Sequence, residues 1–560
     1  MLRFLSLSDR TAILILLVLI AGACFVPRLG DGIFRRIERA AAALARRKRL
    51  VIILLLLLVP ALRLSLLHFM PVPVPRVHDE FSYLLAADTF AHGRLTNPTH
   101  PMWRYMESIH VNQVPTYMSK YPPAQGAVLA FGQLLGNAWI GVVLSTSLMC
   151  GAVLWMMQGW LPPRWALLGG ILVAVRFAIA GYWMNSYWGG SVTALAGALV
   201  AGAVPRIIRR YRWQDAMVLG LGAAILGLSR PLEGLFFCLP VAAYLALCLA
   251  SKKSPPLRVT AIRLIAPVTV LLAATVIFTG YYNFRLTGSV LTLPYQLNDR
   301  TYSSTPPFVW QKIGTPIPQK NPTLESFYNG WSRSYWNRTH FASEWHVAKF
   351  VYFYIWPEWC LVLPFFYFLL LDRRVRFLLL QFCFSFLATL IVVWFEPHYT
   401  AALLANLFVL VVQAVRYLRQ FRPNGRFIGV GVSRVLVLFA IAAMPVRVFS
   451  EVKRVHGQFR ASPSAVWDVP GDSVQTRVEA ELNSLPGQHL VILRDPVGGV
   501  SPAIFNKADI DDAKIVWAYE IPDLPMQPLL AYFQGRTVWL LQTTAAGPKL
   551  TAYPQGTGAR

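Results

Sequence analysis

Two short segments of this chain place charged side chains next to apolar runs, where they could take part in chemistry at a membrane surface. Asp79 and Glu80 are adjacent in the first segment, and Lys120 and Tyr121 precede two prolines in the second. A carboxylate can take a proton from a hydroxyl group, and an ammonium group can bind a phosphate. Adjacent helical residues point about 100° apart, so both carboxylates cannot reach one atom. Of these two candidate catalytic residues, we expect Asp79 to be the general base and Glu80 to orient the site, while Lys120 and Tyr121 bind substrate.

Each of these charges also has a structural explanation. Residues 78–93 have the apolar spacing of a short helix that ends at a glycine. In that helix Asp79 could cap the first turn, and Glu80 could interact favourably with the helix dipole. Lys120 could extend its ammonium group to the lipid head groups. The residue pattern leaves both explanations open.

Four further candidates lie in two short breaks between apolar runs. Arg230 and Glu233 follow each other across a proline, inside an apolar stretch where isolated charges are costly and often mark a site. His398 and Tyr399 occupy the second break, and an imidazole can hydrogen-bond a phosphate or a sugar. We predict that these four residues bind substrate. The structural alternatives are an Arg230–Glu233 ion pair that closes the turn and a hydrogen-bonded interfacial histidine.

The composition defines the class of protein that must position these groups. The 560 residues are 56% hydrophobic and only 14% charged, with a mean hydropathy of +0.48. Several apolar runs are long enough to cross a hydrocarbon layer of roughly 30 Å, so we predict a polytopic α-helical membrane protein. The net charge of +26 comes from short basic clusters between these runs. Such clusters are typical of cytoplasmic loops, and we expect no nucleic-acid partner.

The basic clusters also predict the topology. Residues 28–50 carry eight Lys/Arg against two Asp/Glu, which places them in the cytoplasm. The run 50–69 then leads outward, and 71–123, with four Lys/Arg and four Asp/Glu, becomes an outer loop. Residues 124–136 reach only about 20 Å and are expected to form an interfacial or re-entrant helix. With 11–27 as an uncleaved first helix, we predict about twelve spans, the others at approximately 138–159, 166–184, 190–204, 215–230, 232–250, 264–282, 347–371, 377–395, 399–417 and 427–449.

Three parts are expected along the chain. Residues 1–50 hold the first helix and the basic segment, and 51–449 form the transmembrane domain with outer loops at 71–123 and 283–346. The tail, 450–560, has ten Lys/Arg against eleven Asp/Glu and contains short strand-like runs between Pro, Gly and Asp turns. We therefore predict a small extracytoplasmic α/β domain with strands at 489–493, 515–518 and 537–541.

In combination, these features resemble the GT-C class of integral-membrane glycosyltransferases, specifically the bacterial relatives of protein O-mannosyltransferases and of the lipid A aminoarabinose transferase. The resemblance rests on Asp79-Glu80 in the first large outer loop, Lys120 with Pro122-Pro123 at its end, about a dozen spans and an outer C-terminal domain. It covers about residues 50–450. It implies transfer of a sugar from a polyprenyl-phosphate carrier to an acceptor at the outer face of the membrane, usually with inversion. Separately, we expect this membrane to be a bacterial inner membrane. Asp79 would activate the acceptor, and Lys120 would bind the carrier phosphate.

The chain also departs from the pattern of this class. A histidine precedes Asp79, a tyrosine follows Lys120, and Asn185-Ser186 stand where some relatives have an acidic residue. The last difference removes one possible metal ligand, so we expect no obligatory cofactor or metal, although the acidic pair could recruit a divalent cation. The acceptor implied by the resemblance is left open between a protein, a lipid and a polysaccharide.

Two other functions fit a chain with many spans. A transporter or flippase for a lipid-linked sugar would favour charges near the middle of the membrane and a repeated half. We find no internal repeat, and the charges cluster at the predicted outer ends. A structural subunit that scaffolds an envelope complex through its tail would not need Asp79 or Lys120. Membrane lipids, a polyprenyl-phosphate-linked donor and an acceptor are the expected partners.

Overall fold

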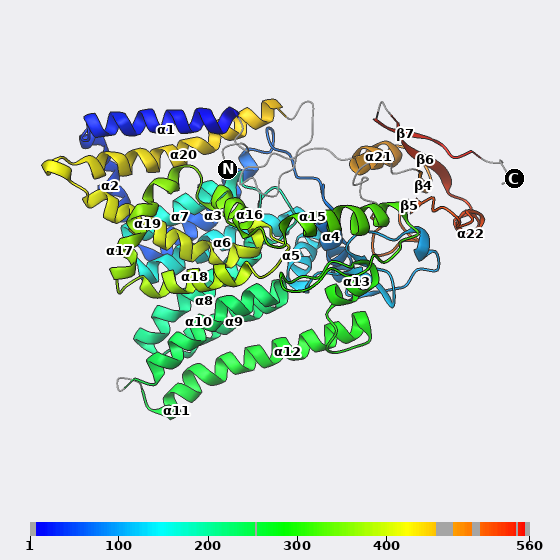
Figure 1. Cartoon of the computed structure of the whole chain (residues 1–560), viewed down its shortest axis with the longest axis horizontal. Helices are drawn as coiled ribbons and strands as arrows, with labels where there is room; N and C mark the ends of the chain where they lie inside the picture. The colour runs from blue at the N-terminus through cyan, green and yellow to red at the C-terminus, as the bar shows by residue number, and fades with distance from the viewer. Residues whose placement is uncertain (1–6, 252–254, 455–473, 495–504, 545–546, 555–560) are drawn as a thin grey trace.

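The computed structural model of the chain describes residues 7–251, 255–454, 474–494, 505–544 and 547–554. Long helices form one part of the molecule, and a sheet with short helices forms a smaller part at one end (Figure 1). The segments that follow the early helix α3 (Lys48–Ser65) lie beside this sheet. The predicted combination of a polytopic helical domain and a C-terminal α/β domain is confirmed.

Six segments of the described chain are long and apolar enough to cross a membrane. A bent helix pair makes a seventh if it is counted as one span. Shorter helices overlap the other predicted spans, so about twelve spans remains a prediction. The six segments are α6 (Ala138–Trp160), α8 (Gly190–Arg210), α10 (Pro231–Leu249), Leu257–Thr287 with α12 (Ala266–Thr287), Pro397–Gln420 with α19 (Leu404–Gln420), and Ile428–Val446 in α20 (Ile428–Arg454). The shorter helices that overlap predicted spans are α1 (Leu7–Phe25), α3 (Lys48–Ser65), α7 (Pro163–Val173), α9 (Trp213–Ser229) and α18 (Arg376–Thr389), whereas α2 (Asp31–Ala45) falls in the predicted cytoplasmic segment.

The span predicted at 347–371 is broken in the structure. The chain there forms α16 (Ser343–Tyr354) and a second helical piece, Glu358–Leu371, and the two are bent by 110°. Pro357 lies at the break. Proline interrupts a helix because it has no backbone N–H and disfavours the helical conformation in the preceding residue. Arg176 donates hydrogen bonds of 2.9 Å to the carbonyls of Phe353 and Trp356 and one of 2.6 Å to Glu358. It therefore satisfies polar groups that the break releases inside the bundle.

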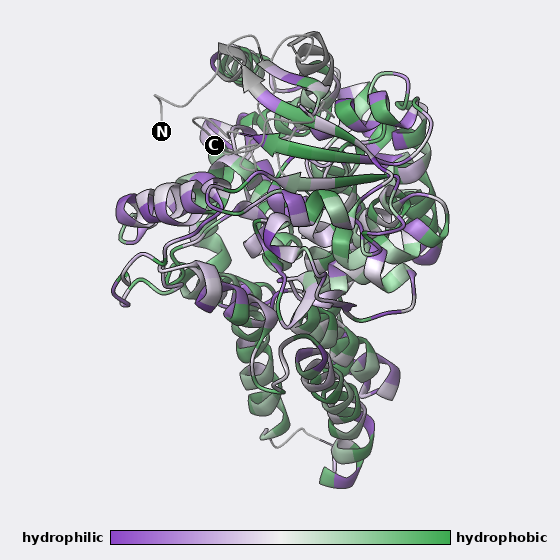
Figure 2. Cartoon of the chain, turned by 90° about the vertical axis from the view of Figure 1, so that its right-hand side faces the viewer, coloured by the Kyte–Doolittle hydropathy of each residue, from purple (hydrophilic) through white to green (hydrophobic). Residues whose placement is uncertain are grey.

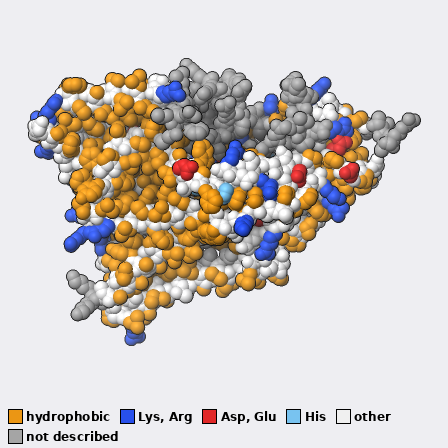
Figure 3. Space-filling view, in the orientation of Figure 1, with side chains coloured by type: hydrophobic (Ala, Val, Ile, Leu, Met, Phe, Trp, Pro, Cys, Tyr) orange, Lys and Arg blue, Asp and Glu red, His pale blue; other side chains and the backbone are white. Residues whose placement is uncertain are grey.

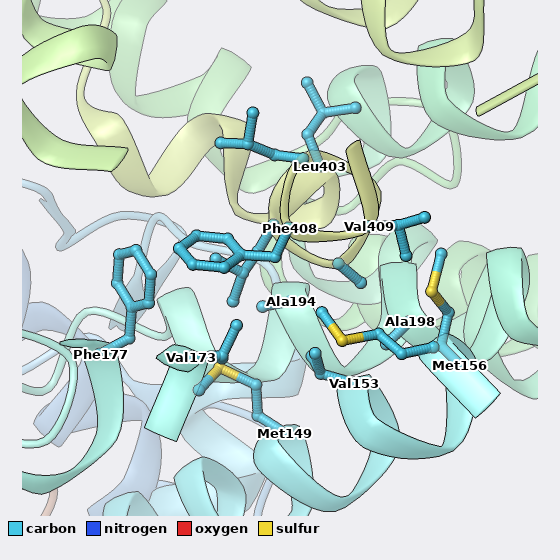
Figure 4. Packing of buried hydrophobic residues seen from close by; sticks show 14 of the residues in the cluster. Met149, Val153, Met156, Val173, Phe177, Ala194, Ala198, Leu403, Phe408 and Val409 are labelled. Atoms are coloured by element: carbon cyan, nitrogen blue, oxygen red, sulfur yellow. The ribbon is translucent and has the colours of Figure 1, made fainter. Parts of the chain in front are cut away.

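The core of the bundle lies between α6, α7, α8 and α19. Met149 and Val153 of α6 point toward Phe408 and Val409 of α19, with small residues of α8 such as Ala194 between them (Figure 4). Small side chains let helices approach closely where lipid gives no hydrophobic driving force for association. Gly197 of α8 is one such position, since an added Cβ would lie 2.2 Å from the Ala402 carbonyl oxygen.

The outer surface of the bundle is apolar. In the segment that ends in α12, only 6% of the most apolar 18-residue stretch is buried in the protein. Val276 and Ile277 are 71% and 73% exposed. Figure 3 shows a broad hydrophobic surface over the helices, with basic side chains at its left edge. Exposed aliphatic side chains on this scale are expected where a helix faces lipid.

The first outer segment folds into a helix, a small sheet and a second helix. Helix α4 (His78–Ala91) matches the predicted helix and stops before Gly93, whose φ of +72° suits glycine. Helix α5 (Pro123–Leu134) has 12 residues and matches the predicted short apolar helix. Between them β1 (Asn97–Pro98), β3 (Thr116–Ser119) and β2 (Val111–Asn112) form an antiparallel sheet in that order. The later outer segment adds α13 (Pro294–Tyr302), α14 (Pro322–Leu324) and α15 (Arg333–Thr339).

The C-terminal domain is a four-stranded sheet with the order β5-β4-β6-β7. Strands β4 (His489–Arg494), β5 (Ile515–Tyr519) and β6 (Thr537–Thr544) are parallel, as expected for an α/β domain, and confirm the three predicted strands. Strand β7 (Gly547–Ala552) was not predicted, because its sequence lacks an apolar run. The sheet is seen across the front of Figure 2, and its helices are α21 (Val474–Asn483) and α22 (Gln527–Tyr532).

This domain packs directly on the first outer segment. The rings of Phe81 and Phe505 stack with centroids 4.5 Å apart, inside a buried apolar cluster shared by the two parts. The Tyr117 hydroxyl donates to the Asn506 carbonyl at 2.8 Å. Arg94 forms an ion pair with Asp509 at 2.7 Å. Helix α4 and the C-terminal sheet therefore lie on the same end of the bundle.

Replacing Phe505 by Ala should loosen this contact. Truncation of a buried phenylalanine usually costs about 3 kcal/mol or more, because it removes apolar contacts and leaves a cavity. We expect a lower unfolding temperature in detergent and faster proteolysis of the tail. The exposed Lys549→Ala variant is the control, and unchanged proteolysis of both variants would show that the contact does not hold the domain in place.

Candidate functional site

The candidate base, Asp79, lies in the first turn of α4 and is held by a tyrosine. The Tyr121 hydroxyl donates a short hydrogen bond to Asp79 Oδ1. His110 Nε2 lies 3.9 Å from Asp79 Oδ2, and the Asp79 side chain is 24% exposed. Burial, together with the charge of Asp79, raises the pKa of Tyr121 well above its ordinary value, so the phenol stays protonated and remains a donor. The carboxylate is therefore oriented and still reached by solvent.

Glu80 is used differently from its neighbour. It is buried, and its Oε2 accepts the backbone N–H groups of Arg76 at 2.8 Å and Val77 at 3.1 Å. Its Oε1 accepts the Tyr187 N–H at 3.0 Å. Glu80, and not Asp79, therefore bonds the free N–H groups at the start of α4. Both carboxylate oxygens of Glu80 thus hold backbone groups in place, and its orienting role and its place among the catalytic residues stay predictions.

Aromatic rings connect the Asp79 segment to the two breaks between helices. Tyr83 of α4 stacks on Tyr121 with centroids 4.5 Å apart. The Arg230 guanidinium lies over the Tyr399 ring at 4.0 Å from its centroid. Tyr83 and Tyr399 each interact electrostatically with both Asp79 and Arg230. Folding thus brings the predicted residues from three distant segments together around one carboxylate.

Arg230 and Glu233 do not form the ion pair that the sequence allowed. Arg230 lies at the junction of α9 and α10, and among the described residues no ion pair within 4.0 Å joins it to Glu233. The two charges interact at longer range, and the guanidinium instead faces Tyr399. A cation on an aromatic face keeps its N–H groups available for an anionic ligand.

Lys120 is largely enclosed by the outer segments. Its side chain is 13% exposed, and its Nζ lies 3.9 Å from Asp299 Oδ1 of α13. The Lys120 backbone N–H donates to the His110 carbonyl at 3.1 Å, which fixes the strand end beside Asp79. The ammonium group is therefore held between outer segments of the protein. A substrate phosphate would meet a cation that is already positioned.

His398 is buried beside the same cluster. Its ring stands edge-on to Trp188 and Tyr399, with centroids 4.6 and 4.8 Å apart. Within the described part of the chain, its Nδ1 has no hydrogen-bond partner. The simple alternative of a fully hydrogen-bonded interfacial histidine is therefore not realised, and the free nitrogen is available to a ligand.

Sequence reasoning missed two residues near the site. His110 lies beside Asp79 and its backbone has a φ of +66°, a conformation that no motif indicated. Lys349 of α16 donates 2.8 and 3.0 Å hydrogen bonds to Glu396 Oε1 and the Phe395 carbonyl, in the break that holds His398. A lysine within an apolar helix was a signal that could have been found in the sequence.

No group of three or more His, Cys, Asp or Glu side chains is placed to hold a metal ion, as far as the described residues are concerned. Asp79 and Glu80 do not form a joint ligand pair, because both Glu80 oxygens accept backbone hydrogen bonds. The expectation of no obligatory metal stays a prediction, which chelation before an activity assay would test.

The stability of this region should depend on pH through His78. His78 is buried edge-on to Phe327, and burial lowers the pKa of its imidazole from 6.5 to about 4. The unfolded chain binds the proton more tightly than the folded protein does. The contribution of neutral His78 to the free energy of unfolding is therefore fully present above pH 6.5 and falls as the pH drops toward 4. We expect a loss of about 2 kcal/mol at pH 5. Unfolding temperatures at several pH values should show a smaller slope for His78→Phe, and equal slopes would contradict the assignment.

The helical bundle and the C-terminal sheet domain together form a fold that is similar to the fold of solved GT-C glycosyltransferases. The crystal structure of the lipid A aminoarabinose transferase ArnT from Cupriavidus metallidurans in the apo state is similar, with a TM-score of 0.50 and 11% identity over 88% of this chain and 93% of that chain. At this identity the likeness establishes the fold.

Two other solved structures are less similar. ArnT from the same organism bound to undecaprenyl phosphate has a TM-score of 0.47 at 10% identity, covering 88% of this chain and 93% of that chain. The oligosaccharyltransferase AglB from Archaeoglobus fulgidus, in complex with an inhibitory peptide and a dolichol-phosphate, has a TM-score of 0.40 at 10% identity, covering 89% and 69%. No protein-family model and no curated protein sequence matches the chain.

Proposed function

We propose that this protein transfers a sugar from a polyprenyl-phosphate-linked donor to an acceptor at the outer face of a bacterial inner membrane. The observation that carries the proposal is the convergence of an oriented carboxylate, Asp79, with the cations Lys120 and Arg230 at one end of a GT-C fold. Displacement of a phosphate by a hydroxyl group needs a base on one side and positive charge on the other. An active site for water-soluble substrates would not require a membrane-spanning bundle next to it.

The reaction is a single inverting displacement. The acceptor oxygen attacks the anomeric carbon of the sugar while the bond from that carbon to the phosphate oxygen breaks. Asp79 takes the proton of the acceptor hydroxyl, and the carrier leaves as a polyprenyl phosphate. Lys120 and Arg230 interact with the negative charge that develops on the departing phosphate. His398 and Tyr399 contribute to the surface that holds the donor.

The C-terminal domain lies on the same side of the membrane as Asp79 in this proposal, because it packs against α4. The basic clusters at the opposite helix ends favour a cytoplasmic location for those ends. Both considerations support a reaction outside the cytoplasm, where an acceptor protein, lipid or polysaccharide would meet the site.

Transfer of radiolabelled sugar from polyprenyl-phosphate donors tests the proposal. Membranes that contain the protein should label an endogenous acceptor, and membranes from cells with an empty vector should not. Fractionation of the labelled product into protein, lipid and polysaccharide identifies the acceptor class. Labelled lipid that crosses a vesicle bilayer without any transfer would favour the flippase alternative instead.

Arg230→Gln should weaken donor binding about tenfold, because a charge-assisted contact to phosphate is lost. Direct binding of a polyprenyl phosphate to the purified protein measures this effect separately from turnover. The exposed Arg285→Gln variant on α12 is the control, since it removes the same charge from a lipid-facing helix. Equal affinity of the two variants would remove Arg230 from the phosphate site.

A further inference from the structure

A second charged feature lies at the far end of the bundle from Asp79. A cavity of about 330 Å³ opens between the start of α3, the end of α6 and the end of α8. Helix α8 begins next to the turn that contacts Glu80 through Tyr187, and its 21 residues span about 30 Å. The cavity is therefore separated from the candidate active site by roughly the thickness of a hydrocarbon layer.

The cavity is lined by positive charge without matching negative charge. None of its five basic residues forms an ion pair within 4.0 Å with any described acidic residue. Asp215 interacts with Arg206 at longer range. The five basic residues are Lys48, Arg49, Arg206, Arg209 and Arg210.

Two of the guanidinium groups are fixed by the protein itself. Arg206 donates to the carbonyls of Gly202 at 2.6 Å and Trp155 at 2.7 Å, and Arg209 donates to the Gly159 carbonyl at 3.1 Å. The Arg206 guanidinium also lies over the Trp155 ring, 3.8 Å from its centroid. The rigid part of the cationic wall is thus formed before any ligand arrives.

Three neighbouring features shape this cationic wall. An added Cβ at Gly159 would lie 2.8 Å from Arg206 Nη1, so the glycine makes room for the guanidinium. Gln158 donates to the Lys48 carbonyl at 3.1 Å and ties α6 to the start of α3. The first turn of α3 has no side-chain cap, and uncapped N–H groups at a helix start favour negative charge.

We propose that this cavity binds the phosphate group of an anionic phospholipid from the adjacent leaflet. Ile52 and the Trp155 indole give the cavity an apolar wall beside its cations, which suits a head group that continues into acyl chains. Basic pockets between membrane helices bind such head groups. An inorganic phosphate or a soluble phosphate ester has the same anionic chemistry without the acyl chains.

The test compares the affinities of the purified full-length protein for three probes. The probes are phosphatidylglycerol, phosphatidylcholine and inorganic phosphate, each titrated in detergent. The test variant is the triple substitution Lys48→Gln, Arg49→Gln and Arg210→Gln, which leaves the two fixed guanidinium groups in place. The matched control removes three charges from another exposed basic cluster, as Arg373→Gln, Arg374→Gln and Arg376→Gln.

Phosphatidylglycerol should bind the wild type and the control alike and should bind the triple variant on the order of a hundredfold more weakly, at about fivefold for each charge removed. Phosphatidylcholine should not bind the cavity. Gln158→Glu adds one carboxylate without removing a basic residue, and it should weaken phosphatidylglycerol binding even if the triple variant folds poorly.

Equal binding of phosphatidylglycerol by the wild type, the triple variant and Gln158→Glu would overturn the proposal. Binding of inorganic phosphate as tightly as phosphatidylglycerol would overturn the lipid as the source, and a soluble phosphate would take its place.

Discussion

Replacing Asp79 by Asn should lower the rate of sugar transfer by about a thousandfold while donor binding is retained, because general-base catalysis contributes typically 10²- to 10⁴-fold. The asparagine oxygen can still accept the hydrogen bond that the Tyr121 hydroxyl donates to Asp79 Oδ1. The geometry of the site is therefore kept, and only the basicity is lost. Initial rates of transfer in membranes with equal amounts of the two proteins measure the effect, and binding of a polyprenyl phosphate is measured in parallel.

Tyr121→Phe is the matched control for this experiment. It removes the hydrogen bond but leaves the carboxylate, so the loss should be about tenfold, as expected for one charge-assisted hydrogen bond. Transfer at the wild-type rate by Asp79→Asn would exclude this carboxylate as the base.

Replacing Glu80 by Ala should destabilise the outer part of the protein by about 4 kcal/mol, since one buried and two partly buried N–H groups lose their acceptor at about 1–3 kcal/mol each. These groups belong to Arg76, Val77 and Tyr187, so the loss would detach the start of α4 from the turn before α8. We expect a lower unfolding temperature in detergent. We also expect a parallel loss of transfer, because the neighbouring Asp79 would lose its position when the start of α4 is detached.

Glu80→Gln and Glu344→Ala complete this series. The glutamine keeps one acceptor oxygen, so its effect should be smaller, at about 2 kcal/mol. Glu344 is exposed on α16, and its replacement should leave the unfolding temperature unchanged. A Glu80→Ala protein that melts like the wild type but does not transfer sugar would show that Glu80 takes part in the chemistry directly.

Local sequence features predicted much of the fold. Helices such as α6 and α10 follow from runs of apolar residues of sufficient length, and the strands β4, β5 and β6 follow from short β-branched runs between turn residues. The bend at Pro357 was missed, although the proline itself is a local signal, because the apolar run continues through it. Strand β7 was missed because its pairing with β6, and not its own composition, makes it a strand.

The candidate site was predicted in part. The residue types at Asp79, Lys120 and Arg230 already indicated a base and two cations near a membrane surface. His110 and Lys349 were missed because each acquires its relation to the site only through folding. Arg230 stays a predicted substrate-binding residue. Its structural alternative, an ion pair with Glu233, is not found within 4.0 Å among the described residues, and the guanidinium faces Tyr399 instead.

The sequence by itself determined that this is a helical membrane protein with an α/β tail, because hydrophobic length and period are properties of neighbouring residues. The tertiary structure alone decided which partners each of the two adjacent carboxylates binds. Glu80 accepts a hydrogen bond from the backbone N–H of Tyr187, which is 107 residues away in the sequence. Asp79 accepts one from the hydroxyl of Tyr121, which is 42 residues away. The partners of a side chain come from segments that only folding brings together. Two neighbouring carboxylates can therefore differ, so that one holds backbone groups and the other is a candidate base.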